Sequence, residues 1–94
     1  MKITIFELSG CPYCRQERQI IEELIKEHPE YGDLTIERID EALEPGLADQ
    51  YDYYYVPSIF AGEEKLYEAD PAWSRDEAKL RIGQALSAAV SQLS

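Results

Sequence analysis

Two cysteines separated by two residues are the most reactive feature of the chain. Cys11 and Cys14 are its only cysteines, and they lie in the segment "CPYC". Pro12 favours the first turn of a helix, where unpaired N–H groups and a partial positive charge help a cysteine to ionise. Arg15 would add positive charge nearby, although a solvated arginine fits the pattern equally well. We therefore predict a dithiol site in which Cys11 is the nucleophile and Cys14 lies about one helical turn away.

A C-x-x-C pair also occurs in zinc sites, so a metal centre is the first alternative. Structural zinc takes four ligands, whereas this chain has no second cysteine pair and one histidine, His28, expected near the end of a helix. We therefore expect no metal ion at the dithiol. A rival hypothesis from another functional class is that Cys11 helps to hold a metal or an iron–sulfur cluster between two protomers. Pro12 and Cys14 argue against this hypothesis, because a second protein thiol competes with cluster retention.

Alternating strand and helix patterns surround the cysteines and would position them. Strands are expected over 2–8, 34–40, 57–62 and 64–69, and helices over 12–28, over 44–51 and in the C-terminal segment. Ser74 followed by Glu77 is a capping box that would start the last helix. A strand–helix–strand start predicts a parallel pair with a right-handed crossover, and the last two strands form an antiparallel hairpin. We predict one α/β domain over residues 1–94, with a four-stranded mixed sheet flanked by three helices.

The overall charge limits the classes of partner. The chain has 94 residues with 19 acids and 9 bases, a net charge of −10. Nucleic acid and anionic membrane are therefore not expected as partners, because both require a cationic face. The apolar runs are too short to span a bilayer, and the first residues lack the pattern of a secretory signal. We expect a cytoplasmic protein, in which thiols stay reduced and a structural disulfide is not expected.

The run "YDYYYVPSIF" has the composition of a strand but contains Pro57. Proline has no N–H to give to a sheet, so it is expected at the start of a strand and not inside one. Pro57 lies 46 residues after Cys11 (57 − 11 = 46).

Together, "CPYC", "YVP" and the order of elements resemble the dithiol glutaredoxins of the thioredoxin superfamily across nearly the whole chain. The resemblance implies a thioredoxin fold and reduction of disulfides by thiol–disulfide exchange, with no organic cofactor. It also implies a cis peptide bond between Val56 and Pro57 beside the cysteines, with the Val56 backbone free to pair with an extended substrate. Cys14 would be the resolving thiol. The implied partners are disulfide-containing proteins or glutathione, and we expect a monomer.

Two departures from the superfamily bear on the reductant. Thioredoxins carry a buried acid and a tryptophan at the positions of Ile5 and Gly10, so their absence favours a glutaredoxin-like site. Glutaredoxins, however, grip glutathione with a Gly-Gly pair and an aspartate; here Glu68 and Ala69 replace the glycines, and Asp70 stands for the aspartate. Side chains at those positions restrict the approach of a ligand to the backbone. The alternative is therefore a thioredoxin-like protein recycled by a thioredoxin reductase.

Several tyrosines are candidates for substrate contact. Tyr13 lies between the cysteines and Tyr55 precedes Val-Pro, so the two are expected to form an aromatic rim at the site. Phe60 and Trp73 are expected in the core.

Overall fold

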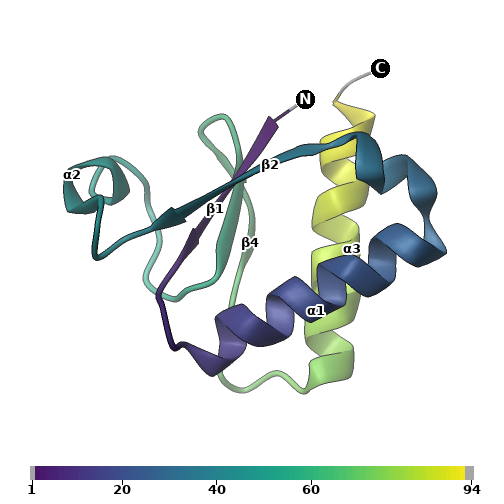
Figure 1. Ribbon diagram of the computed structural model, residues 1–94, viewed down its shortest axis with the longest axis horizontal. Coiled ribbons are helices and arrows are strands. Elements are labelled where there is room, and N and C mark those ends of the chain that lie inside the picture. The colour runs from purple at the N-terminus through teal and green to yellow at the C-terminus, as the bar shows by residue number, and fades with distance from the viewer. Residues whose placement is uncertain (1, 93–94) are drawn as a thin grey trace.

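The structure is a computed structural model and describes residues 2–92. Its regular elements, in chain order, are β1 (Lys2–Glu7), α1 (Pro12–Glu27), the 3₁₀ helix η1 (Pro29–Asp33), β2 (Thr35–Asp40), α2 (Pro45–Ala48), β3 (Ser58–Ala61), β4 (Glu64–Glu68) and α3 (Arg75–Ser91). The strands form one sheet in the order β2-β1-β3-β4. Helices α1 and α3 cross on one face of the sheet, and α2 lies beyond its other face (Figure 1).

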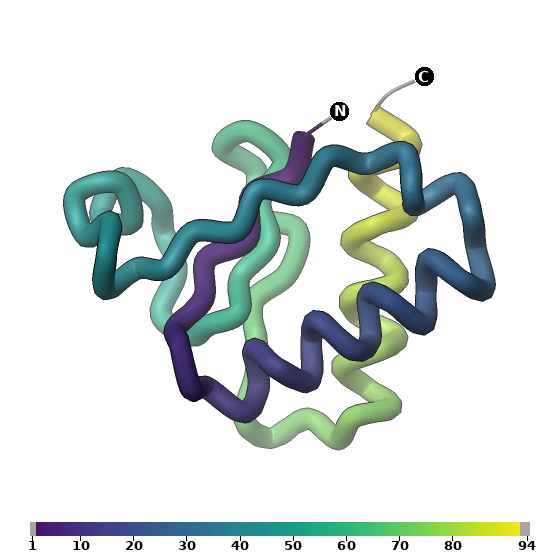
Figure 2. The backbone as a smooth tube through the Cα atoms, viewed as in Figure 1, coloured from purple at the N-terminus to yellow at the C-terminus, as the bar shows by residue number. Residues whose placement is uncertain are grey.

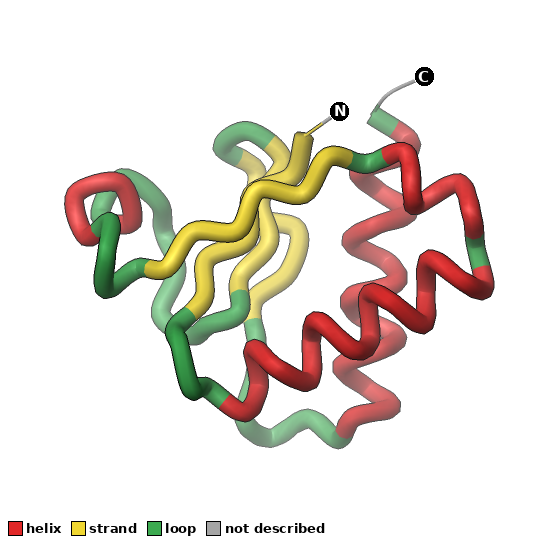
Figure 3. Tube along the Cα trace, in the orientation of Figure 1, coloured by secondary structure: helices red, strands yellow, loops and turns green. Residues whose placement is uncertain are grey.

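The predicted fold class is confirmed. Strands β1 and β2 are parallel, whereas β3 is antiparallel to both β1 and β4. The sequence did not predict η1, which occupies the Pro- and Gly-containing segment after α1, and the observed α2 is one short turn. Strand β3 starts at Ser58, one residue after the proline that has no N–H to donate. Figure 3 shows the segment between α2 and β3 as an irregular green stretch that leads back to the sheet.

The central strand β1 is buried on both faces. Ile3 and Ile5 contact the cluster that α1 and α3 form, whereas Phe6 lies in a second cluster on the opposite face. This two-sided burial explains why the alternating isoleucines of the strand are followed by Phe6, an apolar residue on the second face. Each such side chain contributes about 1.5–3 kcal/mol when it is fully buried. The strand that precedes the cysteines is therefore held firmly.

The second cluster packs the aromatic segment before β3 against the sheet. The Phe6 ring lies 4.8 Å from the Tyr51 ring and 5.0 Å from the Tyr53 ring, and Phe60 joins them. The predicted burial of Phe60 is thus confirmed. The hydroxyl of Tyr53 donates to the Glu41 carboxylate at 2.6 Å. Figure 2 shows this teal part of the chain folding back towards the sheet before β3.

Helix α3 begins at the predicted cap. The Ser74 hydroxyl accepts a hydrogen bond from the Glu77 N–H at 3.2 Å, and Asp76 and Glu77 in the first turn suit the positive end of the helix dipole. Ion pairs then join α3 to α1, with Arg75 on Glu23 and Lys79 on Glu27. None of the helices within residues 2–92 is long and apolar enough to cross a membrane.

Candidate active site

The turn between β1 and α1 places Cys11 at the N-cap of α1. Gly10 takes a positive φ of 81° in that turn, a conformation that glycine adopts easily. The Cys11 N–H then donates to the Leu8 carbonyl at 3.3 Å, and the Cys11 carbonyl accepts from the Arg15 N–H at 3.1 Å. Within residues 2–92, the Cys11 side chain makes no capping hydrogen bond at this helix end. The sulfur of Cys11 therefore stands where the helix presents its unpaired N–H groups and positive dipole end.

The two thiols differ in exposure. Cys11 is partly exposed and Cys14 is buried, with 4% of its surface accessible, and neither is in a disulfide. Burial raises the pKa of the Cys14 thiol to about 12; a hydrogen bond with the Leu8 backbone opposes the rise, and Cys11 and the Glu7 carboxylate add to it. At neutral pH, Cys14 is therefore a protonated thiol that solvent reaches poorly. The two thiols of the pair therefore differ in their access to solvent and in how readily they ionise.

A polar cavity of about 360 Å³ opens beside both cysteines. Its lining comes from the end of β1, the turn, the first half of α1 and the end of β2: Glu7, Leu8, Ser9, Gly10, Cys11, Cys14, Arg15, Arg18 and Asp40. Arg15 lines this cavity and is exposed, so both of its sequence-based interpretations stay open. Arg18 is a second arginine there, which the sequence did not indicate. Both acids and bases line the cavity, so it suits polar groups.

Beneath α1 lies a network of ion pairs that the sequence analysis missed. Arg38 on β2 donates to Glu17 at 2.9 and 3.1 Å and to Glu7 at 3.4 Å. Arg18 holds Glu7 from the other side at 2.5 Å. Burial raises the pKa of Glu17, and the guanidinium of Arg38 opposes that rise. The signal that could have revealed the network is Arg38 itself, which interrupts the apolar alternation of its strand.

The dithiol turn and the Val-Pro segment leave the sheet at the same end. Strands β1 and β3 are antiparallel and Phe6 pairs with Ser58, so the residues after β1 lie beside those before β3. The peptide bond between Val56 and Pro57 is cis, the configuration that the resemblance implies. Pro57 is buried, and its carbonyl accepts from the Ala69 N–H at 3.0 Å.

The backbone around Val56 is held by its neighbours. The Ser58 hydroxyl donates to the Tyr55 carbonyl at 2.5 Å. The N–H groups of Tyr54 and Tyr55 both donate to the Glu68 carboxylate, at 2.7 and 2.8 Å. Within residues 2–92, the N–H and the carbonyl of Val56 make no hydrogen bond. Val56 therefore offers one donor and one acceptor that an extended chain can use.

Two adjoining hollows connect the other predicted site residues. Tyr13 and Asp70 line a narrow cleft next to α1, and Tyr55 and Asp70 line an open hollow of about 420 Å³. Trp73 lines both hollows and is half-buried, because its ring also packs against the core at Tyr67. The expectation that Trp73 is a core residue is therefore only partly right. Tyr13 and Tyr55 thus line different hollows, which have Asp70 and Trp73 in common.

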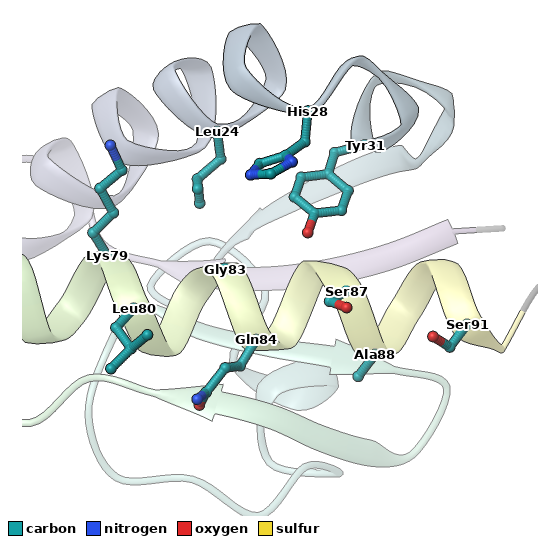
Figure 4. Close-up of a pocket in the computed structure, with 10 residues that line it drawn as sticks. All are labelled: Leu24, His28, Tyr31, Lys79, Leu80, Gly83, Gln84, Ser87, Ala88 and Ser91. Atoms are coloured by element: carbon teal, nitrogen blue, oxygen red, sulfur yellow. The ribbon is translucent and has the colours of Figure 1, made fainter.

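A separate cavity of about 570 Å³ lies between the second half of α1 and α3. Figure 4 shows Leu24, His28 and Tyr31 on one side and Leu80 and Gln84 on the other. Neither cysteine lines this cavity. Among residues 2–92, no group of three or more His, Cys, Asp and Glu side chains is arranged to hold a metal ion.

Among known proteins, solved structures share the architecture of this chain. No family model matches the chain, and no match was found among curated protein sequences. The chain is similar to the structure of thioredoxin 1 from the thermophilic eubacterium Thermosipho africanus TCF52B, with 24% identity, a TM-score of 0.58, and coverage of 94% of this chain and 97% of that chain. It is also similar to a structure described as that of a malarial protein, with 17% identity, a TM-score of 0.58, and coverage of 90% and 96%. The chain therefore has the thioredoxin fold, with a cysteine pair at the start of its first helix.

Proposed function

We propose that the protein is a dithiol–disulfide oxidoreductase that reduces disulfide bonds of proteins or of glutathione adducts. The observation that supports this function best is the unequal burial of the two thiols at the start of α1, one partly exposed at the N-cap and one buried. Thiol–disulfide exchange needs one sulfur that reaches the substrate and a second that reaches only the first.

The reaction proceeds in two exchanges. The Cys11 thiolate attacks one sulfur of the substrate disulfide, forms a mixed disulfide and releases the other substrate sulfur as a thiolate, which takes up a proton. Cys14 then loses its proton and attacks the sulfur of Cys11. The products are the Cys11–Cys14 disulfide and the second substrate thiol. The substrate gains two electrons from the protein and two protons. One proton is that of Cys14, and the other comes from solvent, which had received the proton of Cys11 when that thiol ionised.

The second exchange requires the proton of Cys14 to leave a buried position. Because burial raises the pKa of Cys14 to about 12, little thiolate forms before the mixed disulfide is made. The resolving thiol therefore stays protonated while the protein waits for substrate. In the mixed disulfide, the leaving substrate sulfur is the acceptor to which that proton is finally delivered.

An external dithiol or thiol must reduce the Cys11–Cys14 disulfide again. The "CPYC" motif supports a glutaredoxin-like protein reset by glutathione. The replacement of the glycine pair by Glu68 and Ala69 supports the second candidate, a thioredoxin-like protein reset by a thioredoxin reductase. We propose a monomer that works in the reducing cytoplasm, where such chemistry has a supply of electrons.

A coupled assay tests both the activity and the reductant. Insulin disulfides are offered with NADPH and either glutathione plus glutathione reductase or thioredoxin reductase, and NADPH oxidation is followed. We expect turnover in one of the two systems and none with Cys11→Ser. A wild-type protein that accelerates insulin reduction in neither system, and does not exceed dithiothreitol alone, would contradict the proposed function.

A further inference from the structure

We propose that Glu68 is a positioning residue for polypeptide disulfides, because its carboxylate fixes the backbone that presents Val56 to the substrate. This inference rests on the proposed function and adds to it a residue outside the dithiol. Glu68 is the last residue of β4 and pairs with Ser58, the first residue of β3. It therefore stands at the end of the sheet from which the Val-Pro segment and the dithiol turn both emerge.

The contacts of Glu68 are directed at the backbone before the cis peptide bond. Its Oε2 atom accepts from the N–H of Tyr54 at 2.7 Å and from the N–H of Tyr55 at 2.8 Å. Hydrogen bonds to a carboxylate are shorter and stronger than those between neutral groups. Two consecutive amides bound to one oxygen fix the direction of the chain there. The next residue is Val56.

The carboxylate is itself held in place. Lys65, three residues earlier on the same strand, donates to the Oε1 atom of Glu68 at 2.7 Å. The Glu68 side chain is 19% exposed, so these bonds are partly shielded from water. Both carboxylate oxygens of Glu68 therefore have hydrogen-bond partners. Glu68 itself belongs to strand β4, so the residue that binds the Tyr54 and Tyr55 amides is part of the sheet. A binding backbone supported in this way is pre-organised for its ligand.

Side-chain packing does little to hold Tyr54 and Tyr55. Tyr54 is 91% exposed and Tyr55 is 54% exposed, whereas Tyr51 and Tyr53 pack their rings against Phe6. The hydrogen bonds to Glu68 are therefore what holds the Tyr54 and Tyr55 amides, while the Ser58 hydroxyl holds the Tyr55 carbonyl and Val56 packs against the second cluster. Without Glu68, the two amides lose their acceptor, and the backbone of Tyr54 and Tyr55 is held at the Tyr55 carbonyl alone.

The consequence differs between classes of substrate. A polypeptide disulfide can pair its main chain with the open N–H and carbonyl of Val56, and this pairing depends on where Val56 points. A small disulfide without a peptide chain needs only the Cys11 sulfur. Glu68 is therefore expected to lower the KM for polypeptide disulfides and to leave the reaction with small disulfides unchanged.

Three variants separate positioning from a general loss of charge. Glu68→Ala removes the acceptor, and Glu68→Gln keeps one acceptor oxygen without the charge. Glu63→Gln is the matched control, because Glu63 is an exposed acid in the turn before β4 and makes no hydrogen bond or ion pair within residues 2–92. The readouts are KM and kcat with insulin, the rate with hydroxyethyl disulfide, and amide hydrogen exchange of Tyr54 and Tyr55.

In Glu68→Ala, we expect a rise of about tenfold in the KM for insulin, which is what the loss of one hydrogen bond between the substrate and Val56 corresponds to. The rate with hydroxyethyl disulfide stays unchanged, amide exchange of Tyr54 and Tyr55 accelerates, and Glu68→Gln lies between Glu68→Ala and wild type. Equal losses on both substrates, or the same KM change in Glu63→Gln, would overturn the inference. If wild type reduces neither substrate, the proposed function fails. The exchange rates then decide alone: acceleration confined to the Glu68 variants supports positioning, and unchanged rates overturn it.

Discussion

Arg38 on β2 holds the buried carboxylate of Glu17 on α1 with two hydrogen bonds, at 2.9 and 3.1 Å. Glu17 is the most deeply buried charged residue among residues 2–92, with 1% of its surface exposed. The pair ties the first half of the helix that carries both cysteines to the sheet beneath it. Each of the two charges thus has the other as its partner, which is the condition under which a buried pair is tolerated.

Removing one partner of this pair should destabilise the protein strongly. We expect Arg38→Met to cost about 3–5 kcal/mol in the free energy of unfolding, because Glu17 is then a buried charge without a partner. The double variant Arg38→Met/Glu17→Leu should recover most of that loss, since an apolar pair of similar volume carries no desolvation cost. Denaturant unfolding of the two variants checks this. A double variant as unstable as Arg38→Met would contradict this explanation, because the loss of stability would then not come from the unpaired Glu17 charge.

The Ser74 cap offers a smaller and local test of stability. Ser74→Ala removes the acceptor of the Glu77 N–H at the start of α3 and should cost about 1 kcal/mol in the free energy of unfolding. Ser87→Ala, at an exposed position inside the same helix, is the control and should be neutral or slightly stabilising, because alanine favours helices. The two variants are compared by thermal or urea unfolding. If Ser74→Ala and Ser87→Ala changed the free energy of unfolding equally, the Ser74 cap would not stabilise α3.

The burial of Cys14 predicts unequal alkylation. In the reduced native protein near neutral pH, iodoacetamide should modify Cys11 and leave Cys14 untouched, because the Cys14 thiol is buried and its pKa is raised to about 12. In denaturant, both cysteines should react. Peptide mapping by mass spectrometry distinguishes them. Comparable labelling of Cys14 in the native protein would refute the assignment of an inner, protected thiol.

The same shift predicts a loss of stability of the reduced protein at alkaline pH. The pKa of Cys14 is raised in the folded state, so its contribution is fully present below the pKa of an unfolded thiol. This contribution of Cys14 to the free energy of unfolding is lost as the pH rises from the pKa of an unfolded thiol towards about 12. The oxidised protein has no thiol to ionise. The difference in unfolding free energy between reduced and Cys14→Ala protein should therefore shrink in this range, and a constant difference would contradict the burial argument.

The Glu68 carboxylate gives the opposite dependence on pH. Burial would raise the pKa of Glu68, but hydrogen bonds from Lys65 and from the Tyr55 and Tyr54 amides outweigh it, and the pKa is lowered. Its contribution to stability is present above the ordinary carboxyl pKa and is lost as the pH falls through the lowered value. The stability difference between wild type and Glu68→Gln should therefore vanish on acidification. A difference that grows towards low pH would have the wrong sign.

The sequence predicted those features that local pattern determines. The apolar alternation of β1, the Ser74 cap of α3 and the start of α1 at Pro12 each depend on residues within a few positions of one another. The order of these elements then restricts the sheet to few topologies. This is why the fold and the position of the cysteine pair could both be predicted.

The contacts that complete the site join residues far apart in the chain. Arg38 and Glu17 are separated by 21 positions, and Glu68 and Tyr54 by 14. Nothing near Glu68 in the sequence indicates that its carboxylate turns towards two backbone amides. Similarly, no local pattern separates Tyr53, whose ring packs against Phe6, from the exposed Tyr54 beside it. These choices depend on register and packing, which only the folded chain defines.

Trapping of the mixed disulfide tests the central claim most directly. Reduced wild type, Cys11→Ser and Cys14→Ser are each mixed with a peptide disulfide, quenched with acid and analysed by intact mass and peptide mapping. We expect Cys14→Ser to accumulate a covalent adduct on Cys11, Cys11→Ser to form none, and wild type to end as the internal Cys11–Cys14 disulfide. An adduct on Cys14, or a Cys14→Ser protein that forms no adduct, would contradict the account.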